Sequence, residues 1–234
     1  MNIALIKAGG VGQRMGAGIP KQFISIDGKP IIIYTLESFE KHPNIDEIVV
    51  VCVKGWHDIL RSYCKQFGIT KVKMIVNGGE TSLKSIKNGL VAMRDRYSDD
   101  DMILVHDGNR PLISPEIISD TIANCEHYGS AVAAIPVTDE VMEIEGEARA
   151  STKFLDRKKM YRIQTPDAYR FSVLWSLFEK ATDEQLTNLG ATNTLMIACG
   201  GTVHFAQGSE LNIRLTTQED IILCKSLLIM REKQ

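Results

Sequence analysis

The sequence predicts an α/β protein with a Rossmann-like, doubly wound and mostly parallel sheet. Short apolar runs alternate along the chain with amphipathic segments of helical period. Runs such as residues 48–53 are apolar throughout, which is typical of strands that helices cover on both faces. With 234 residues, of which 44% are hydrophobic, the chain can bury one large core, and we expect a single domain over residues 1–234.

The expected elements follow from this alternation in chain order. The apolar runs predict strands at residues 3–6, 47–53, 72–76, 102–106 and 131–137. The amphipathic segments between them predict helices at residues 31–41, 58–67, 82–93 and 115–127. Beyond them we expect a helix near residues 171–182, a strand near 202–207 and a last helix with its N-cap around Thr216.

A glycine-rich loop follows the first strand. Its small residues are Ala8, Gly9, Gly10 and Gly12. Glycines allow positive φ angles and a close approach of the backbone, so consecutive N–H groups can point at anionic oxygens. Such a loop suits phosphates, although glycines alone also mark ordinary tight turns.

Two cations on this loop favour the phosphate-binding interpretation. Arg14 offers a planar fork for phosphate, and Lys21 adds a mobile point charge. A dinucleotide-binding fingerprint fits less well, because Met15 stands at its third glycine and Lys54 follows the second strand where an acid would bind ribose. The chain also lacks the Gly-Lys-Ser/Thr run of a nucleoside-triphosphatase loop.

Two further loops follow predicted strands at the same sheet edge. Asp107 follows the fourth strand, where a carboxylate can hold Mg²⁺ against nucleotide phosphates or simply cap the turn before Gly108. Gly78 and Gly79 follow the third strand, with the Ser85 hydroxyl nearby. This second loop can read the edge of a base, and an ordinary helix cap explains it equally well.

Residues 138–163 are rich in charge yet contain alternating apolar residues, which predicts a protruding β-ribbon. An isolated ribbon is marginally stable in water, so we expect a dimerisation arm that packs against a second copy. A disordered insertion is the alternative, which Val141, Ile144 and Phe154 disfavour. Arg157 on the ribbon can reach a phosphorylated second substrate, or it can be an ordinary solvated charge.

Charge and cysteine content argue against several classes of protein. The formal net charge of −2 disfavours a general nucleic-acid-binding surface. The five cysteines have no paired spacing, so neither a zinc site nor a redox motif is indicated. The first strand follows directly on Met1 without a leader, and no apolar run is long enough to span a bilayer, so we expect a cytoplasmic protein without a membrane partner.

Taken together, these motifs resemble the cytidylyltransferases that act on methylerythritol phosphate or ribitol phosphate. The matching segments extend over nearly the whole chain: residues 8–15, 20–23, 78–80, 105–107, 110–111, 136–137, 164–166 and 212–216. The resemblance implies one Rossmann-like nucleotidyltransferase domain with a β-arm that completes the site of the dimer partner. It also implies a Mg²⁺-dependent attack of an alditol phosphate on the α-phosphorus of CTP.

The same resemblance implies roles for individual residues. It implies catalytic roles for Arg14, Lys21 and Arg214. It implies that CTP is bound by Ala8, Gly9, Gly10, Gly12, Gly78, Gly79, Ser85 and Asp107. It implies that the second substrate is bound by Arg110 and Arg157, and that Mg²⁺ is bound by Asp107 and Asn193.

Three positions depart from the family pattern. Asn193 stands in place of a metal-binding aspartate, Arg214 in place of a lysine, and Lys7 in place of a small or apolar residue. Segments such as residues 85–88 and 161–170 are more similar to the ribitol-phosphate branch, so D-ribitol 5-phosphate is the favoured acceptor. The alternatives are methylerythritol phosphate as the acceptor, or a nucleotide-binding paralogue without turnover, for which Asn193 is the discriminating residue.

Overall fold

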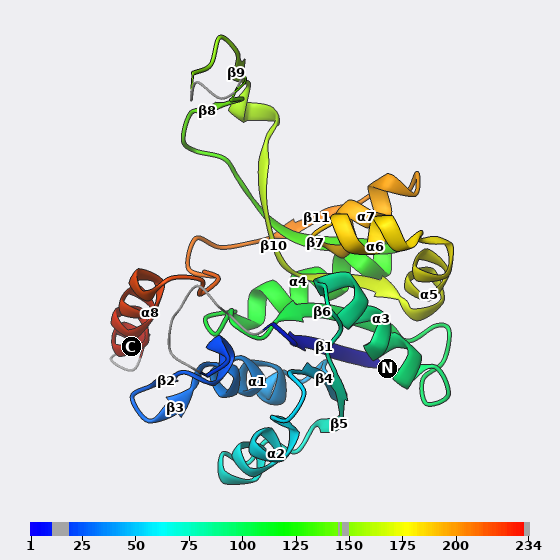
Figure 1. The fold of residues 1–234 in the computed structure, drawn as a ribbon, viewed down its shortest axis with the longest axis vertical. Coiled ribbons are helices and arrows are strands. Elements are labelled where there is room, and N and C mark those ends of the chain that lie inside the picture. Colours follow the sequence, from blue (N-terminus) through cyan, green and yellow to red (C-terminus); the bar gives the residue numbers. More distant parts are fainter. Residues whose placement is uncertain (11–18, 145, 147–149, 232–234) are drawn as a thin grey trace.

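The computed structural model describes residues 1–10, 19–144, 146 and 150–231, and these residues build a central seven-stranded sheet (Figure 1). In chain order its strands are β1 (Asn2–Ala8), β4 (Glu47–Cys52), β5 (Val72–Asn77), β6 (Met102–Asp107), β7 (Ser130–Pro136), β10 (Tyr161–Arg170) and β11 (Phe205–Gln207). Across the sheet their order is β11-β7-β10-β6-β1-β4-β5.

Most neighbouring strands run parallel. β1 lies between β4 and β6, β5 pairs with β4, and β11 pairs with β7, all in parallel register. β10 is inserted between β6 and β7 and runs antiparallel to both. The predicted doubly wound, mostly parallel sheet is therefore confirmed, and β10 is an addition to the predicted strands.

Helices cover both faces of this sheet, as the wholly apolar strands predict. One face is covered by α1 (Ile31–Lys41), α2 (His57–Gln66) and α4 (Pro115–Tyr128). The other is covered by α3 (Ser82–Met93), α5 (Phe171–Lys180), α6 (Asp183–Asn188) and α7 (Thr192–Ala198). Alternation along β1 sends Ala4 and Ile6 into the first apolar cluster and Ile3 and Leu5 into the second.

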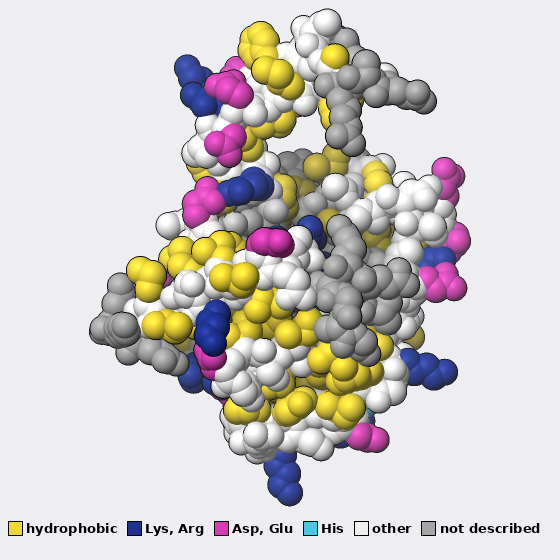
Figure 2. Space-filling model, turned by 60° about the vertical axis from the view of Figure 1, so that its left-hand side comes forward, with side chains coloured by type: hydrophobic (Ala, Val, Ile, Leu, Met, Phe, Trp, Pro, Cys, Tyr) yellow, Lys and Arg dark blue, Asp and Glu magenta, His cyan; other side chains and the backbone are white. Residues whose placement is uncertain are grey.

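The segment predicted as a β-ribbon protrudes from the sheet as an arm (Figure 1). Within it β8 (Val141–Met142) pairs antiparallel with β9 (Phe154–Leu155), and the 3-10 turn η3 (Arg157–Lys159) leads into β10. Figure 2 shows hydrophobic side chains beside charged ones on the arm, and Ile144 and Phe154 are among the exposed residues. Because the paired strands are so short, the arm has little hydrogen-bonded ladder of its own.

The remaining elements frame the sheet at its carboxyl edge. They are η2 (Lys21–Phe23), β2 (Ser25–Ile26), β3 (Lys29–Pro30) and α8 (Gln218–Arg231). The backbone N–H groups of Thr216 and Thr217 donate to the Asp220 carboxylate at 2.6 and 2.8 Å, which confirms the predicted N-terminus of the last helix. The five cysteines are free thiols, and all except Cys199 are buried. Among the described residues, we find no helix with the length and apolarity needed to cross a bilayer.

Candidate active site

A cleft of about 730 Å³ opens where β1 and β6 end. From β1 the chain crosses first to β4 on one side and later to β6 on the other, so this edge is the switch point of the sheet. Ligands of open α/β sheets bind at such points, and the volume lies within the usual range for small-molecule sites. The described residues that line the cleft come from the glycine loop, η2, the start of α3, the end of β6, β10, the turn before α7 and the segment before α8.

Two glycine loops meet at one wall of the cleft. A Cβ at Gly78 would lie 2.9 Å from the Cα of Gly9, so neither loop could approach the other with a larger residue there. The Gly79 N–H donates to the Ser85 hydroxyl at 2.9 Å, which fixes the second loop on the first turn of α3. Thr81 caps that helix by accepting from the Lys84 N–H, so the helix-cap interpretation and the loop–Ser85 contact both hold.

The backbone at the start of the first glycine loop is fixed from behind. The buried side-chain amide of Gln22 donates to the carbonyl oxygens of Ala8 and Gly10 at 2.5 and 3.1 Å. These bonds fix the position of this backbone segment, whose N–H groups are the backbone donors that an anion could accept from. The same turn, η2, brings Lys21 to the cleft.

A cluster of charged residues lies at the bottom of the cleft. Lys7 and Asp107 are register partners on β1 and β6, and the Lys7 Nζ lies 2.9 Å from the Asp107 Oδ1. The Arg110 Nε lies 3.2 Å from the Asp107 Oδ2 and its Nη1 donates to the Asn212 carbonyl at 2.6 Å. Both carboxylate oxygens of Asp107 therefore contact cations. The side chains of Lys7, Asp107 and Arg110 are all largely buried.

The pKa values of this cluster follow from burial and charge. Burial alone would raise the pKa of Asp107, but the charges of Lys7 and Arg110 outweigh it and hold that pKa far below its usual range. Burial lowers the pKa of Arg110, Asp107 opposes this, and the nearby cations Arg214 and Arg162 lower it further. Asp107 is thus an anion at neutral pH, and the cleft rim beside it carries several positive charges.

His106 supports this cluster from the core. It is fully buried, its Nδ1 lies 3.0 Å from the Thr165 hydroxyl, and its Nε2 lies 3.3 Å from the Arg110 carbonyl. Burial lowers its pKa to about 3, so the ring is neutral at physiological pH. The Thr165 hydroxyl also accepts the Asp107 N–H at 3.1 Å. His106 is a buried core histidine with a partner at each ring nitrogen.

A second carboxyl group, Asp167, lies buried on β10 next to this cluster. Its hydroxyl partner is Tyr169, whose phenol donates to the Asp167 Oδ2 at 3.2 Å. Burial raises the pKa of Asp167 to about 6, Lys7 opposes the shift, and the charge of Asp107 adds to it. Nothing in the sequence pattern marks this residue, because it lies in a polar stretch that shows no strand alternation.

Most of the predicted site residues lie together in the cleft. These are Ala8, Gly9, Gly10, Lys21, Gly79, Ser85, Asp107, Arg110, Asn193 and Arg214. Gly78 contacts Gly9 behind the cleft wall. Gly12 and Arg14 lie outside the described residues. Arg157 is on the arm, where it pairs with Glu140 at 3.2 Å, and it does not line the cleft of its own chain.

The donors at Asp107 do not fit a magnesium ion bound by the protein alone. Asp107 already contacts two cations, and Asn193 is neutral. Among the described residues, no group of three His, Cys, Asp or Glu side chains is placed to hold a metal. Coordination of Mg²⁺ by Asp107 and Asn193 stays a prediction, and it requires Lys7 to leave Asp107.

Several cleft residues have weak sequence signals. Lys7 is visible as a lone charge at the end of an apolar strand, and Gln22 directly follows Lys21. Gln164 and Thr165 come from β10, and Asn109 follows Asp107 in the turn after β6. A charged residue near the end of a buried strand is the signal that could have found Lys7.

The sheet, its switch-point cleft, the paired glycine loops and the surrounding cations define a nucleotidyltransferase. The 4-diphosphocytidyl-2C-methyl-D-erythritol synthase of Anaerococcus prevotii has the same fold, with a TM-score of 0.81, 27% identity and coverage of 97% of this chain and 96% of that one. The chain belongs to the cytidylyltransferase family described as IspD, 2-C-methyl-D-erythritol 4-phosphate cytidylyltransferase, whose model matches residues 2–231. The family resemblance predicted from the motifs is confirmed.

Individual relatives within this family carry two different substrate names. The ribitol-5-phosphate cytidylyltransferase of Lacticaseibacillus paracasei is 44% identical and covers 100% of both chains. The ribitol-5-phosphate cytidylyltransferase of Streptococcus agalactiae serotype Ia is 37% identical, over 100% of this chain and 98% of the relative. The 2-C-methyl-D-erythritol 4-phosphate cytidylyltransferase of Syntrophotalea carbinolica is 33% identical, over 96% of this chain and 94% of the relative.

Proposed function

We propose that this cytidylyltransferase converts CTP and D-ribitol 5-phosphate to CDP-ribitol and diphosphate. A phosphate oxygen of the alditol phosphate attacks the α-phosphorus of CTP, and the bond from that phosphorus to the bridging oxygen of the diphosphate breaks. The observation that carries the proposal is the cationic switch-point cleft, in a chain 44% identical over its full length to a ribitol-5-phosphate cytidylyltransferase. CDP-ribitol is an activated polyol, suited to the assembly of cell-wall or capsule polysaccharides.

CTP binding is assigned to the two glycine loops. We assign the triphosphate to the backbone N–H groups of Gly9 and Gly10, in the segment that Gln22 holds by its carbonyls. The Gly79 loop presents backbone groups whose position is set by Ser85, and we assign the recognition of cytosine to it. The loop from Ala8 leads towards Gly12 and Arg14, which keep their predicted roles in binding the triphosphate.

Catalysis is assigned to charge neutralisation and positioning. Two anionic phosphates must meet in this reaction, so fixed cations at the leaving diphosphate and the attacked phosphorus lower the barrier. Lys21 and Arg214 line the cleft and supply such charges. No protein nucleophile is required, which agrees with the neutral, enclosed environment of His106.

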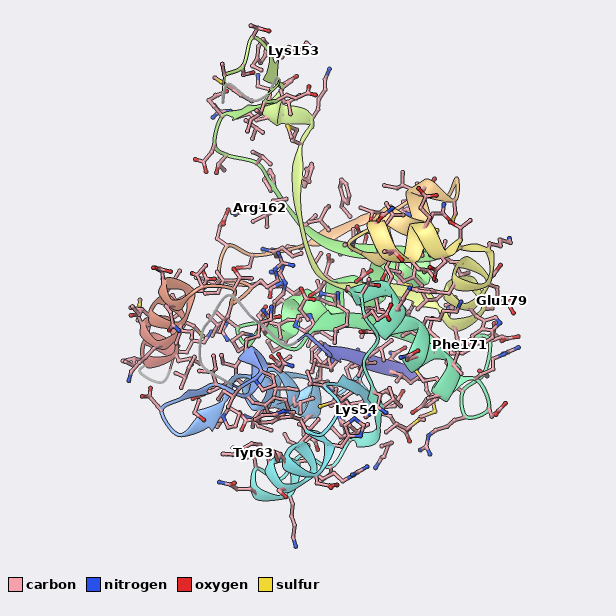
Figure 3. All side chains as sticks on the ribbon, in the orientation of Figure 1. Lys54, Tyr63, Lys153, Arg162, Phe171 and Glu179 are labelled. Carbon is pink, nitrogen blue, oxygen red and sulfur yellow. The ribbon has the colours of Figure 1, made fainter. Side chains whose placement is uncertain are left out.

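The second substrate is assigned to the arginine-rich rim. Arg110 lines the cleft, and Arg214 and Arg162 lie close enough to influence its pKa. Figure 3 labels Arg162 at the base of the arm and Lys153 near its tip. We propose that the protein is a homodimer in which the arm of one copy, with Arg157, reaches the cleft of the other. This arrangement would explain why Arg157 lies outside its own cleft.

Magnesium is assigned to the nucleotide. We propose that Mg²⁺ enters the cleft on the phosphates of CTP, where it offsets the charge of the diphosphate. We propose that the reaction takes place in the cytoplasm. The alternative acceptor is 2-C-methyl-D-erythritol 4-phosphate, which the family description and the relative of Syntrophotalea carbinolica favour.

Diphosphate release from CTP with a panel of alditol phosphates tests the proposal. We expect kcat/KM for D-ribitol 5-phosphate to exceed that for 2-C-methyl-D-erythritol 4-phosphate by at least about tenfold, a difference of roughly 1.4 kcal/mol in transition-state binding. The reverse preference would favour the alternative acceptor. Absence of turnover with every acceptor, together with measurable CTP binding, would favour an inactive paralogue. Parallel assays with UTP, ATP and GTP test the choice of base.

A further inference from the structure

Lys7 is the one charged residue of β1, and it follows four apolar residues at positions 3–6. β1 places Ile3, Leu5 and Lys7 on one face, and the first two are completely buried. Lys7 follows them at the carboxyl end of the row, where it lines the cleft with a side chain that is 14% exposed. An ammonium at such a position loses most of its hydration, so its charge must be matched by the protein or by a ligand.

The neighbouring strands provide this match. The ammonium of Lys7 lies 2.9 Å from Asp107 on β6, its register partner. Asp167 follows on β10, where it pairs in register with Val105 and is influenced by the charge of Lys7. Arg110 contacts the other oxygen of Asp107. Two cations thus face two carboxyl groups, and the carboxylate that faces the cleft is already neutralised.

We propose that the ammonium of Lys7 occupies the cation position at Asp107 and binds the nucleoside triphosphate, so that a divalent cation reaches this cleft only on the nucleotide's own phosphates. The proposal rests on the proposed function for the identity of the ligand. An ammonium has three N–H donors, and Asp107 accepts one of them, so Lys7 can still donate to a phosphate oxygen. The neutral amide of Asn193 in the same cleft agrees with this arrangement, because a carboxylate there would attract a dication.

The cation position is tested by titrating the protein with Mn²⁺ in the absence of nucleotide and detecting free Mn²⁺ by electron paramagnetic resonance. The double variant Lys7→Met/Asn193→Asp removes the ammonium and adds a carboxylate. It should bind one Mn²⁺ per chain at least about tenfold more tightly than the natural protein. Natural protein that binds one Mn²⁺ tightly, with the site lost in Asp107→Asn, overturns the proposal, and this result does not depend on the double variant being folded.

Nucleotide binding is tested by calorimetry with CTP in EDTA. Lys7→Met should weaken CTP binding about tenfold, the effect of losing one hydrogen bond to a charged group. The matched control is Lys54→Met, an exposed lysine after β4 that lies outside the cleft (Figure 3). Equal affinities of Lys7→Met and the natural protein overturn the proposal. If the natural protein neither binds CTP nor uses it with Mg²⁺, the proposed function fails, while the Mn²⁺ titration still decides which cation Asp107 accepts.

Discussion

The cleft and the arm differ in what holds their side chains in place. In the cleft, charged and polar groups are fixed by one another: Asp107 contacts Lys7 and Arg110, and Gln22 binds two loop carbonyls. In the arm, two-residue strands carry apolar side chains that the chain itself leaves in water, with Phe154 74% exposed. The described cleft residues are held by contacts within one copy, whereas the arm leaves large apolar side chains exposed, as the proposed dimer would require.

Lys21→Ala should separate function from assembly most sharply. We expect a loss in kcat of about 10²–10³-fold, or roughly 2.7–4 kcal/mol by analogy with the removal of one donor to a developing charge. The melting temperature and the oligomeric state should be unchanged, because Lys21 lies at the cleft rather than in a core or on the arm. Initial rates, thermal unfolding and light scattering provide the measurements, with Lys54→Ala as the control. A normal rate would remove Lys21 from the site.

Asp167→Asn tests the buried side of the cleft through pH. The folded pKa of about 6 is above the unfolded value, so the protonated carboxyl stabilises the fold at low pH and this stabilisation is lost as pH rises through 6. The asparagine variant cannot ionise. Its free energy of unfolding, relative to the natural protein, should therefore improve by up to about 3 kcal/mol between about pH 4 and pH 7.5. Urea denaturation at each pH measures the difference in free energy of unfolding between the variant and the natural protein. If this difference does not change with pH, Asp167 ionises with an ordinary pKa.

Phe154→Asp tests the arm without touching the cleft. If a second copy covers this side chain, a charge there should weaken the dimer by about 2 kcal/mol or more, since large apolar residues at interfaces carry such energies. Sedimentation at a series of concentrations would show the shift towards monomer. Val91→Asp is the matched control, because Val91 is also an exposed apolar residue but lies on α3. Identical association of both variants would exclude Phe154 from the interface.

Ser85→Ala should have the smallest effect. It removes the hydroxyl that accepts from the Gly79 N–H, a neutral hydrogen bond worth about 0.5–1.5 kcal/mol. We expect a rise of up to about tenfold in KM for CTP and a reduced preference for CTP over UTP, with little change in kcat. Steady-state kinetics with both nucleotides measures it, and Ser62→Ala on the exposed face of α2 is the control. Unchanged selectivity would place base recognition elsewhere.

Strands that are apolar throughout could be predicted because burial on both faces leaves a direct pattern in the sequence. The strand β10 could not be predicted in this way, because its centre contains the buried polar residues Gln164, Thr165 and Asp167, of which the first two line the cleft. The short helices α6 and α7 are equally hard to foresee, since six or seven residues hardly cover two helical turns. A helical period is not recognisable over so few positions.

The candidate site also combines features that the sequence predicts with features that it does not predict. Loops after strands were predictable, because parallel strands bring their carboxyl ends to one edge. The contact between Lys7 and Asp107 depends on the register of two strands that lie about a hundred positions apart in the chain, and no local pattern encodes it. The cation that Asp107 contacts is therefore set by the pairing of β1 with β6 and cannot be read from the local motif around Asp107.

β10 also restricts where this chain can change in length. The strand is the stem of the arm at Tyr161 and a wall of the cleft at Thr165, and it ends beside the core. One residue inserted into it would turn Asp167 from the inner to the outer face and displace the hydroxyl that accepts the Asp107 N–H. Insertions and deletions should be tolerated best at the tip of the arm, beyond the two-residue pairing of β8 with β9, so related chains are expected to differ in length there and to agree along the stem.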